Sequence, residues 1–403
     1  MLDIVDEKLK IKEKVLYSLI MLYPVLNMWS AIVTNHSSLR IFYFAYSIII
    51  LLVYMWGLRI KKSLFFLVMI IVVKLIYDLL TYPGSLSDAI EVAFLLIYLS
   101  IYSDNILSER YIVYLSQNAK VIFGLYVIYL IGVVLTLVTG VGFTNTWNTL
   151  SVQGPYGLAH IFAYELLILL ANCYLLFLRE KRGKKVKWIL LMGIIGVLLL
   201  FTTVRTVLLC IVVVVGYIFL KKNGYKKFGV AVLGVIGLLL AFRYTNIFNS
   251  VLEKTEYAIS LGSVTNARSI IWESSWNYYL NGTVTQKLLG NGIEELMRWN
   301  HAFIRMHIQA HNDFLTVLAA FGLITLTVYL FYLVRFCKQK GGLGLLLALL
   351  VLIIYNGLYS YSALVIGLPS LKLVFETINN LYVEKTPSIN RRPVINEKKY
   401  NLM

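Results

Sequence analysis

Long apolar segments separated by short polar connectors make up most of the chain. About 20 apolar residues in a helix cross the hydrocarbon core of a bilayer, because each backbone amide must find its hydrogen-bond partner within the segment. The pattern therefore predicts an all-α, polytopic integral membrane protein with about twelve transmembrane helices. The predicted spans are residues 15–34, 41–58, 63–81, 88–103, 119–139, 156–178, 187–203, 204–220, 228–243, 312–334, 342–359 and 361–383.

Composition supports a single membrane domain over residues 1–403. Hydrophobic residues make up 59% of the chain and charged residues 14%, whereas soluble domains average roughly half apolar and about a quarter charged. The amino-terminal segment has no signal-peptide cleavage site, so we expect the first apolar run to remain as a helix. Three cysteines lie in or beside apolar runs, without the spacing of a metal site or a disulfide framework: Cys173, Cys210 and Cys337.

The positive charges fall mainly on alternate connectors. The net charge of +17 would suggest a nucleic-acid partner in a soluble protein. With the amino terminus placed inside, the inner connectors and the two termini carry 26 Lys and Arg residues. Because Lys and Arg accumulate on the cytoplasmic side, we expect both termini in the cytoplasm and no nucleic-acid partner. The outer side carries eight: Arg40, Arg205, Arg243, Lys254, Arg268, Lys287, Arg298 and Arg305.

One connector is much longer than the others. Residues 244–311 form a hydrophilic stretch predicted to face outward, with a helix-like piece at 266–280 and a break at LLGNGIEEL (288–296). Long connectors in compact proteins are usually functional, so we expect the chemistry there. The basic tail, residues 384–403, is predicted to lie in the cytoplasm near anionic lipid.

Two histidines precede the tenth apolar span, in RMHIQAHNDFLTVLAAFG (305–322). His307 and His311 would share a face of a helix, since they are four residues apart. A zinc protease motif needs Glu after the first His, and the intervening residues here are Ile-Gln-Ala. Two interpretations stay open: histidines at the lipid–water interface, and acid–base catalysis by a group that titrates near neutral pH.

Asn312 and Asp313 follow His311 directly. Either side chain could cap the helix that begins FLTVLAAFGL, and an Asp there also complements the helix dipole. These two residues therefore have a structural explanation that His311 lacks.

Two outward arginines stand out. Arg205 lies at the turn between two very apolar spans, where a charge either marks a functional site or extends to the headgroups. Arg268 lies four residues before Trp272, on the same helical face. A guanidinium suits bidentate phosphate binding, and Trp272 could stack on a sugar or on Arg268. The structural alternative pairs Arg268 with Glu273 in solvent.

Further polar residues lie within the predicted spans. His160 ends the GPYGLAH element that opens the sixth span, and Glu165 follows it. His160 is either a satisfied buried histidine or a second polar group lining the same cavity. Lys74 and Asp78 are four residues apart in the third span. An internal ion pair would neutralise both, although proton relays have the same pattern.

These motifs, in this order, resemble the O-antigen ligase and Wzy-type polysaccharide polymerase family of multi-spanning glycosyltransferases. The resemblance covers most of the chain and implies a GT-C-like helical bundle. Its elements are GPYGLAH (154–160) at a helix start, an Arg in a short outer turn (TTVRT, 202–206), RSIIW (268–272) and GNG (290–292) in the long loop, and HNDFLTVLAAFGLI (311–324).

The resemblance also implies roles. His311 becomes the catalytic base, and Arg205 and Arg268 hold the pyrophosphate of an undecaprenyl-pyrophosphate-linked donor, without a metal or other cofactor. Trp272, Asn312 and Asp313 join them as candidate substrate-binding residues. His160 and His307 are further candidates from the sequence itself, although they and His301 are not matched to family positions.

We expect a polymerase of lipid-linked repeat units in the bacterial cytoplasmic membrane, acting by inversion on its outer face. The implied partners are membrane lipid, the lipid-linked oligosaccharide, and a flippase and chain-length regulator of the same pathway. Richness in Ile, Lys, Asn and Tyr suggests an AT-rich genome, and many such bacteria lack the outer membrane that an O-antigen ligase serves. The ligase and a lipid-linked oligosaccharide flippase remain alternatives.

Overall fold

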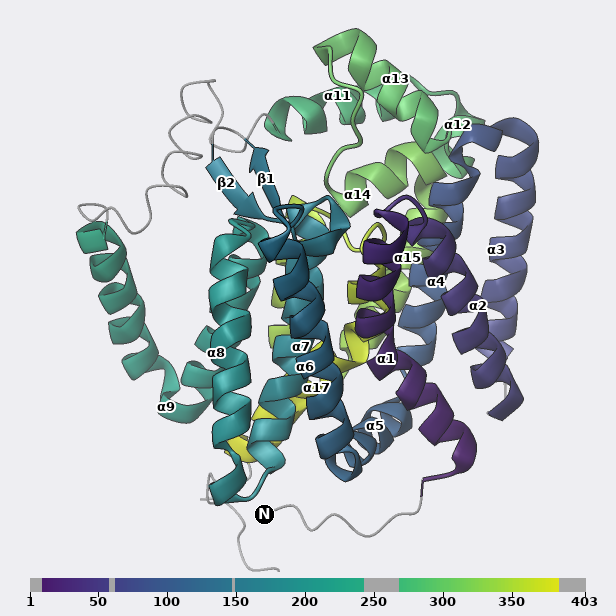
Figure 1. Cartoon of the computed structure of the whole chain (residues 1–403). Helices are drawn as coiled ribbons and strands as arrows, with labels where there is room; N and C mark the ends of the chain where they lie inside the picture. The colour runs from purple at the N-terminus through teal and green to yellow at the C-terminus, as the bar shows by residue number, and fades with distance from the viewer. Residues whose placement is uncertain (1–8, 58–61, 147–148, 243–267, 384–403) are drawn as a thin grey trace, which may run out of the picture.

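The computed structural model describes residues 9–57, 62–146, 149–242 and 268–383; the predicted tail, 384–403, and the first part of the long loop lie outside these ranges. Helices form nearly all of the described chain (Figure 1). Their bounds are α1 (Ile11–Thr34), α2 (Leu39–Gly57), α3 (Lys62–Thr81), α4 (Leu86–Tyr102), α5 (Asn105–Gln117), α6 (Ala119–Val138), α7 (Ala159–Arg179), α8 (Val186–Phe201), α9 (Arg205–Phe242), α11 (Arg268–Asn281), α12 (Val284–Leu289), α13 (Ile293–Ile304), α14 (Asp313–Thr316), α15 (Gly322–Cys337), α16 (Gly342–Tyr355) and α17 (Ser362–Val383).

Within the described ranges, nine helical segments are long and apolar enough to cross a membrane. Two further apolar helices, α8 and α16, are shorter. The all-α class and the many apolar spans are therefore confirmed. The count of twelve stays a prediction, because the span predicted at 228–243 falls on the last part of α9, whose side chains lie outside the description. Gly224, with φ 76°, turns the chain inside the predicted connector 221–227.

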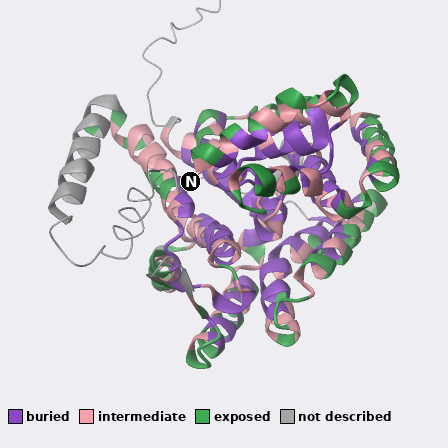
Figure 2. Cartoon of the chain, turned by 90° about the horizontal axis from the view of Figure 1, so that it is seen from above, coloured by how far each residue is buried: buried purple, intermediate pink, exposed green. Residues whose placement is uncertain are grey.

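The bundle is centred on α7 and α17, which pack against each other. Within the most apolar 18 residues of these two spans 72% and 83% are buried, against 22% for α3. Figure 2 shows the buried residues gathered in the middle of the bundle and exposed ones around its rim. The rim is itself apolar: Phe65, Phe66, Val73 and Leu80 of α3 are all more than half exposed. Apolar side chains directed outward are expected where lipid is the solvent.

Two buried ionisable side chains inside the bundle, Glu165 and Lys372, have hydrogen-bond partners in neighbouring elements. The Glu165 carboxylate of α7 accepts hydrogen bonds from Asn27 Nδ2 at 2.5 Å, from the Tyr129 hydroxyl at 3.0 Å and from the Tyr156 hydroxyl. Glu165 is thus a buried carboxylate with hydrogen-bond partners on both oxygens. Lys372 of α17, also buried, donates to the Tyr102 carbonyl oxygen at 2.7 Å. Such pairing offsets the cost of desolvating a charge.

Two elements were not predicted. Residues of the fourth connector form α5, which buries the rings of Tyr111 and Tyr114 against the bundle. After α6, the strands β1 (Phe143–Thr146) and β2 (Thr149–Val152) form an antiparallel hairpin. The predicted helix-like piece and the break in the long loop are confirmed as α11 and as the GNG turn between α12 and α13.

The span predicted at 312–334 is interrupted. A π-helical turn (η5, Val317–Phe321) follows α14, and Gly322, the first residue of α15, breaks the helix with φ 86°. The GNG turn packs against this break, and the Gly292 amide donates to the Ala320 carbonyl oxygen at 2.8 Å. The Ala320 carbonyl lies inside a predicted membrane span, and the loop supplies the hydrogen-bond donor that the interrupted helix does not. The GNG element thus has a structural role, because it attaches α12 and α13 to the α14–α15 segment.

We predict that Gly290→Ala destabilises the protein by about 2 kcal/mol or more. Gly290 has φ 88°, and an added Cβ would lie 2.3 Å from the Ala320 carbonyl oxygen. Thermal unfolding of the purified protein in detergent measures the effect. Gly193→Ala in α8 is the matched control, because nothing lies within 4 Å of the added Cβ. Equal unfolding temperatures for the two variants would contradict the close backbone approach.

Candidate functional site

Three distant segments meet at Asn356, in the connector between α16 and α17. Its side-chain oxygen accepts a hydrogen bond from Arg268 Nη2 of α11 at 3.0 Å. Its amide nitrogen lies 3.0 Å from the Thr206 hydroxyl of α9, 3.1 Å from the Tyr164 hydroxyl and 3.4 Å from Nδ1 of His160, both of α7. Asn356 therefore joins two of the predicted site residues, Arg268 and His160, to the helix that begins with Arg205.

The sequence interpretation missed Asn356, which it placed inside an apolar span. The one available signal was a lone amide at membrane depth, where polar side chains are costly and often functional. The guanidinium of Arg268 also lies over the Tyr355 ring, 5.7 Å from its centroid.

Electrostatic interactions link the three predicted catalytic residues through Arg268. Burial, and then the positive charge of Arg205, lower the pKa of Arg268. Burial, and then the charge of Arg268, lower the pKa of His311 to about 4. His311 is therefore neutral at pH 7 and beside a concentration of positive charge. Such a site favours an anion next to an imidazole that can accept a proton.

His311 itself is held in an unusual conformation. Its φ of 50° lies in the left-handed region, which a residue with a Cβ adopts at a cost. Its Nδ1 atom is buried and has no hydrogen-bond partner among the described residues. The side chain lies on the wall of a cavity of about 480 Å³, between α1, α2, α4, α7 and α13. A strained, buried imidazole at a cavity is a candidate functional group.

The lining of this cavity combines charged, polar and apolar side chains. The Arg40 side chain pairs with Asp88 and Glu91, each at 2.7 Å. Leu158, Ile161, Ile293 and Met297 supply apolar surface, and Ser360, Ser362 and Gln309 add hydrogen-bonding groups. The sequence interpretation counted Arg40 only as an outer charge. The sequence did contain a signal for this pairing: two carboxylates, Asp88 and Glu91, lie three residues apart at the start of a predicted span.

Asn312 and Asp313 take different roles. Asn312 Oδ1 accepts from the Leu315 amide at 3.2 Å, so the predicted cap of α14 is confirmed for Asn312. Asp313 instead accepts from the Leu358 amide at 2.7 Å and the Tyr329 hydroxyl at 3.1 Å. This buried carboxylate fixes the connector that carries Asn356. Substrate binding by Asn312 and Asp313 stays a prediction.

The prediction that His307 and His311 share a helical face is wrong. Residues 306–310 are not helical, because α13 ends at Ile304 and the chain extends to reach α14. Both histidines nevertheless line the 480 Å³ cavity. His307 is exposed, and its Nε2 lies 3.8 Å from a Glu294 carboxylate oxygen.

Trp272 is half-buried, and its indole nitrogen donates to the Ala310 carbonyl oxygen at 2.9 Å. The bond ties α11 to the residue directly before His311. The ring packed against Arg268 is that of Tyr355, while Trp272 positions the backbone beside His311.

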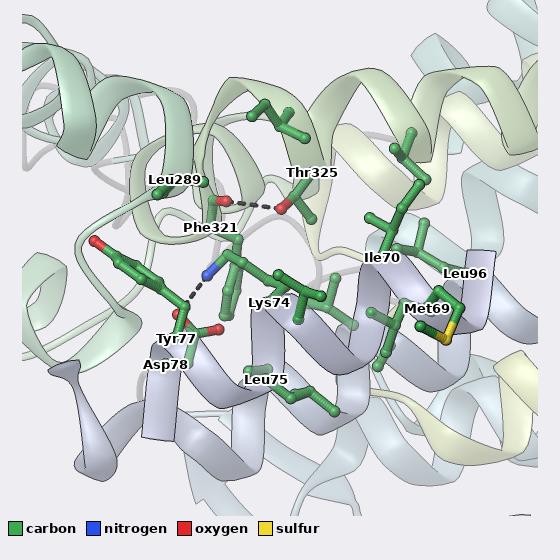
Figure 3. Close-up of a pocket in the computed structure, with 17 residues that line it drawn as sticks. Met69, Ile70, Lys74, Leu75, Tyr77, Asp78, Leu96, Leu289, Phe321 and Thr325 are labelled. Carbon is green, nitrogen blue, oxygen red and sulfur yellow. Dashed lines mark hydrogen bonds and ion pairs between the residues drawn. The ribbon is translucent and has the colours of Figure 1, made fainter. Parts of the chain in front are cut away.

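Lys74 and Asp78 form the ion pair of the structural interpretation, as Figure 3 shows. They lie on the wall of a second cavity, of about 430 Å³, which is otherwise almost entirely apolar. The Lys74 ammonium group also lies over the rings of Tyr77 and Phe321. The pair is neutral as a whole, which explains two charged residues within a predicted span.

No protein-family model matches the chain, and no curated protein matches it. Its function must therefore be argued from the site.

We predict that Asp313→Ala lowers the free energy of unfolding by about 2–4 kcal/mol, because it leaves a buried amide and a buried hydroxyl without an acceptor. Tyr329→Phe removes only one of the two donors and should cost about 1 kcal/mol. Thermal unfolding in detergent separates the two effects. A loss no larger for Asp313→Ala than for Tyr329→Phe would show that Asp313 does not fix the connector.

We also predict that Arg268→Gln raises the pKa of His311 above its value of about 4. The substitution removes a neighbouring positive charge, so the imidazolium becomes less unfavourable, while burial still holds the pKa below about 6.5. Histidine NMR of the labelled protein in nanodiscs measures the titration, with His311→Ala used to assign the signal. An unchanged pKa would show that the charge of Arg268 does not reach the imidazole.

Proposed function

We propose that the protein polymerises undecaprenyl-pyrophosphate-linked oligosaccharide repeat units into a capsular or exopolysaccharide chain. The reaction takes place on the outer face of the bacterial cytoplasmic membrane, with both termini in the cytoplasm. The distribution of 26 against eight basic residues supports this orientation.

One observation carries the proposal: Arg268 lies within electrostatic reach of both Arg205 and a neutral His311, and His311 lines a cavity. Guanidinium groups bind phosphate oxygens through a planar fork, and two together match a pyrophosphate. A neutral imidazole can take a proton from a hydroxyl. An anion site next to a base is the requirement of glycosyl transfer from a lipid pyrophosphate.

In the proposed reaction an acceptor hydroxyl attacks the anomeric carbon of the donor sugar. The new glycosidic bond forms as the bond between this carbon and the pyrophosphate oxygen breaks, and the anomeric configuration inverts. His311 takes the hydroxyl proton, and the electron pair leaves on undecaprenyl pyrophosphate. Arg205 and Arg268 stabilise the negative charge that develops on the leaving group.

The 480 Å³ cavity supplies the place for the acceptor sugar. Its lining has carboxylate, hydroxyl and amide groups that can hydrogen-bond to sugar hydroxyls, and its apolar side chains would limit access of water. Pyrophosphate on Arg268 would offset the charge that lowers the pKa of His311. Donor binding would thereby make His311 a stronger base at the moment it is needed.

We predict that His311→Ala lowers polymer formation by about 10²–10⁴-fold and leaves single repeat units on the lipid, because the base is missing. Glycan size and lipid-linked intermediates in cells carrying the variant measure this. His301→Ala is the matched control: His301 is exposed on α13 and does not line the cavity, so polymer should form normally.

Other results for the His311→Ala variant would favour a different function or a different base. Polymer that accumulates on lipid without transfer would favour an O-antigen ligase. Intermediates held on the inner face would favour a flippase. Normal polymer from His311→Ala would show that His311 is not the base.

A further inference from the structure

A separate hollow opens among the three helices α11, α12 and α13, which cover one end of the bundle (Figure 1). Its volume is about 290 Å³, at the lower end of small-molecule sites. It is lined by Tyr82, Tyr278, Asn281, Gly282, Gln286, Asn291, Glu295 and Trp299. The first of these follows α3, and the others come from the segment 278–299.

The lining is distinctive in composition. Three of the eight residues are aromatic, three carry amides and one carries a carboxylate, and no aliphatic side chain is among them. The cavity at Lys74, in contrast, is lined mainly by Leu, Ile, Val and Met. The cavity at His311 also has six Leu, Ile or Met residues among its sixteen lining residues. Sugar rings present C–H groups that pack on aromatic faces and hydroxyls that pair with amides and carboxylates. This hollow offers both kinds of group together.

The aromatic rings are held in place by the fold. Trp299 donates through Nε1 to the Ser274 carbonyl oxygen at 3.2 Å and stacks on Phe303 with an interplanar angle of 8°. The Tyr278 ring lies with its centroid 5.6 Å from that of Trp299. Rigid aromatic surfaces lose little entropy when a ligand binds.

The polar groups are positioned as well. Asn291 is buried, and its Oδ1 accepts from the Tyr82 hydroxyl at 3.4 Å. Gln286 Oε1 accepts from the Thr283 amide at 2.8 Å in the capping box that begins α12. Asn281 is exposed at the end of α11. The hollow is therefore a preformed set of hydrogen-bonding groups around two ordered rings.

We propose that this hollow binds a carbohydrate chain, as a holding site separate from the reacting groups. Helix α11 connects the two places, with Arg268 at its first residue and Tyr278 ten residues later, about 15 Å along the helix axis. An oligosaccharide of several sugars spans that length. The inference rests on the proposed function, since the bound glycan would be the polymer or its repeat unit.

Saturation-transfer NMR of the full-length protein in nanodiscs tests binding directly. The probe is a set of oligosaccharide fragments cut from the surface polysaccharide of the producing cells, with dextran fragments as an unrelated control. We expect saturation transfer to the sugar C–H protons. Trp299→Leu should weaken binding by about tenfold, and the exposed substitution Asn281→Ala by about fivefold.

Trp276→Leu is the matched control, because Trp276 lies on α11, is 44% exposed and does not line the hollow. Its affinity should match that of the unsubstituted protein. The proposal is overturned if no polysaccharide fragment gives saturation transfer, or if Trp299→Leu and Asn281→Ala both bind normally. Normal sugar binding by Trp299→Leu with weakened anchoring in lipid would instead assign the rings to an interfacial aromatic belt.

The proposed reaction and the proposed holding site can be tested separately. His311→Ala should keep full saturation transfer, because His311 is not in the hollow. Normal polymer from His311→Ala, with sugar binding still lost in Trp299→Leu, would reject the proposed reaction and keep the site. Absent polymer from His311→Ala, with no fragment bound by any form, would keep the reaction and reject the site.

Discussion

The buried carboxylate of Asp313 connects the elements on which the candidate site depends. It accepts hydrogen bonds from the Leu358 amide and the Tyr329 hydroxyl, so it fixes the connector between α16 and α17 against the start of the α14–α15 segment. An added Cβ at Gly357 would lie 2.2 Å from the Asp313 carboxylate, which shows how closely the two chains approach. Asn356, on the same connector, then holds Arg268, while His311 lies two residues before Asp313.

A tension between charge and burial shapes this site. The charge of Arg205 disfavours that of Arg268, and the charge of Arg268 in turn disfavours protonation of His311. Assembling like charges costs free energy that the surrounding bundle must supply. An arrangement of this kind is stabilised by an anionic ligand, and the proposed pyrophosphate donor would provide one. Burial, and then the charge of Arg268, lower the pKa of His311, the proposed base.

Two further features hold the extramembrane helices over this site. The GNG turn satisfies a carbonyl at the break before α15, and Trp272 donates to the carbonyl beside His311. The first contact joins two backbone groups, and the second joins the Trp272 indole to a backbone carbonyl. Both therefore depend more on the position of the backbone than on side-chain chemistry. Helices α11, α12 and α13 are thereby attached to the bundle at the level of His311. The proposed holding site for glycan occupies the far part of the same attached unit.

The sequence by itself determined the apolar spans, the helix over 268–281 and the cap at Asn312, because these follow from hydrophobicity, periodicity and local hydrogen bonding. It also singled out Arg205, since a charge at membrane depth is conspicuous, Arg268 by its spacing to Trp272, and His311 by its place before an apolar span. Only the tertiary structure decided that His307 and His311 are not on one helix, that Asp313 fixes a distant connector, and that Asn356 and Arg40 belong to the site. Those outcomes depend on which segments meet across the bundle. Arg268 and Asn356, for example, are 88 positions apart, and local spacing in the sequence does not reveal their contact.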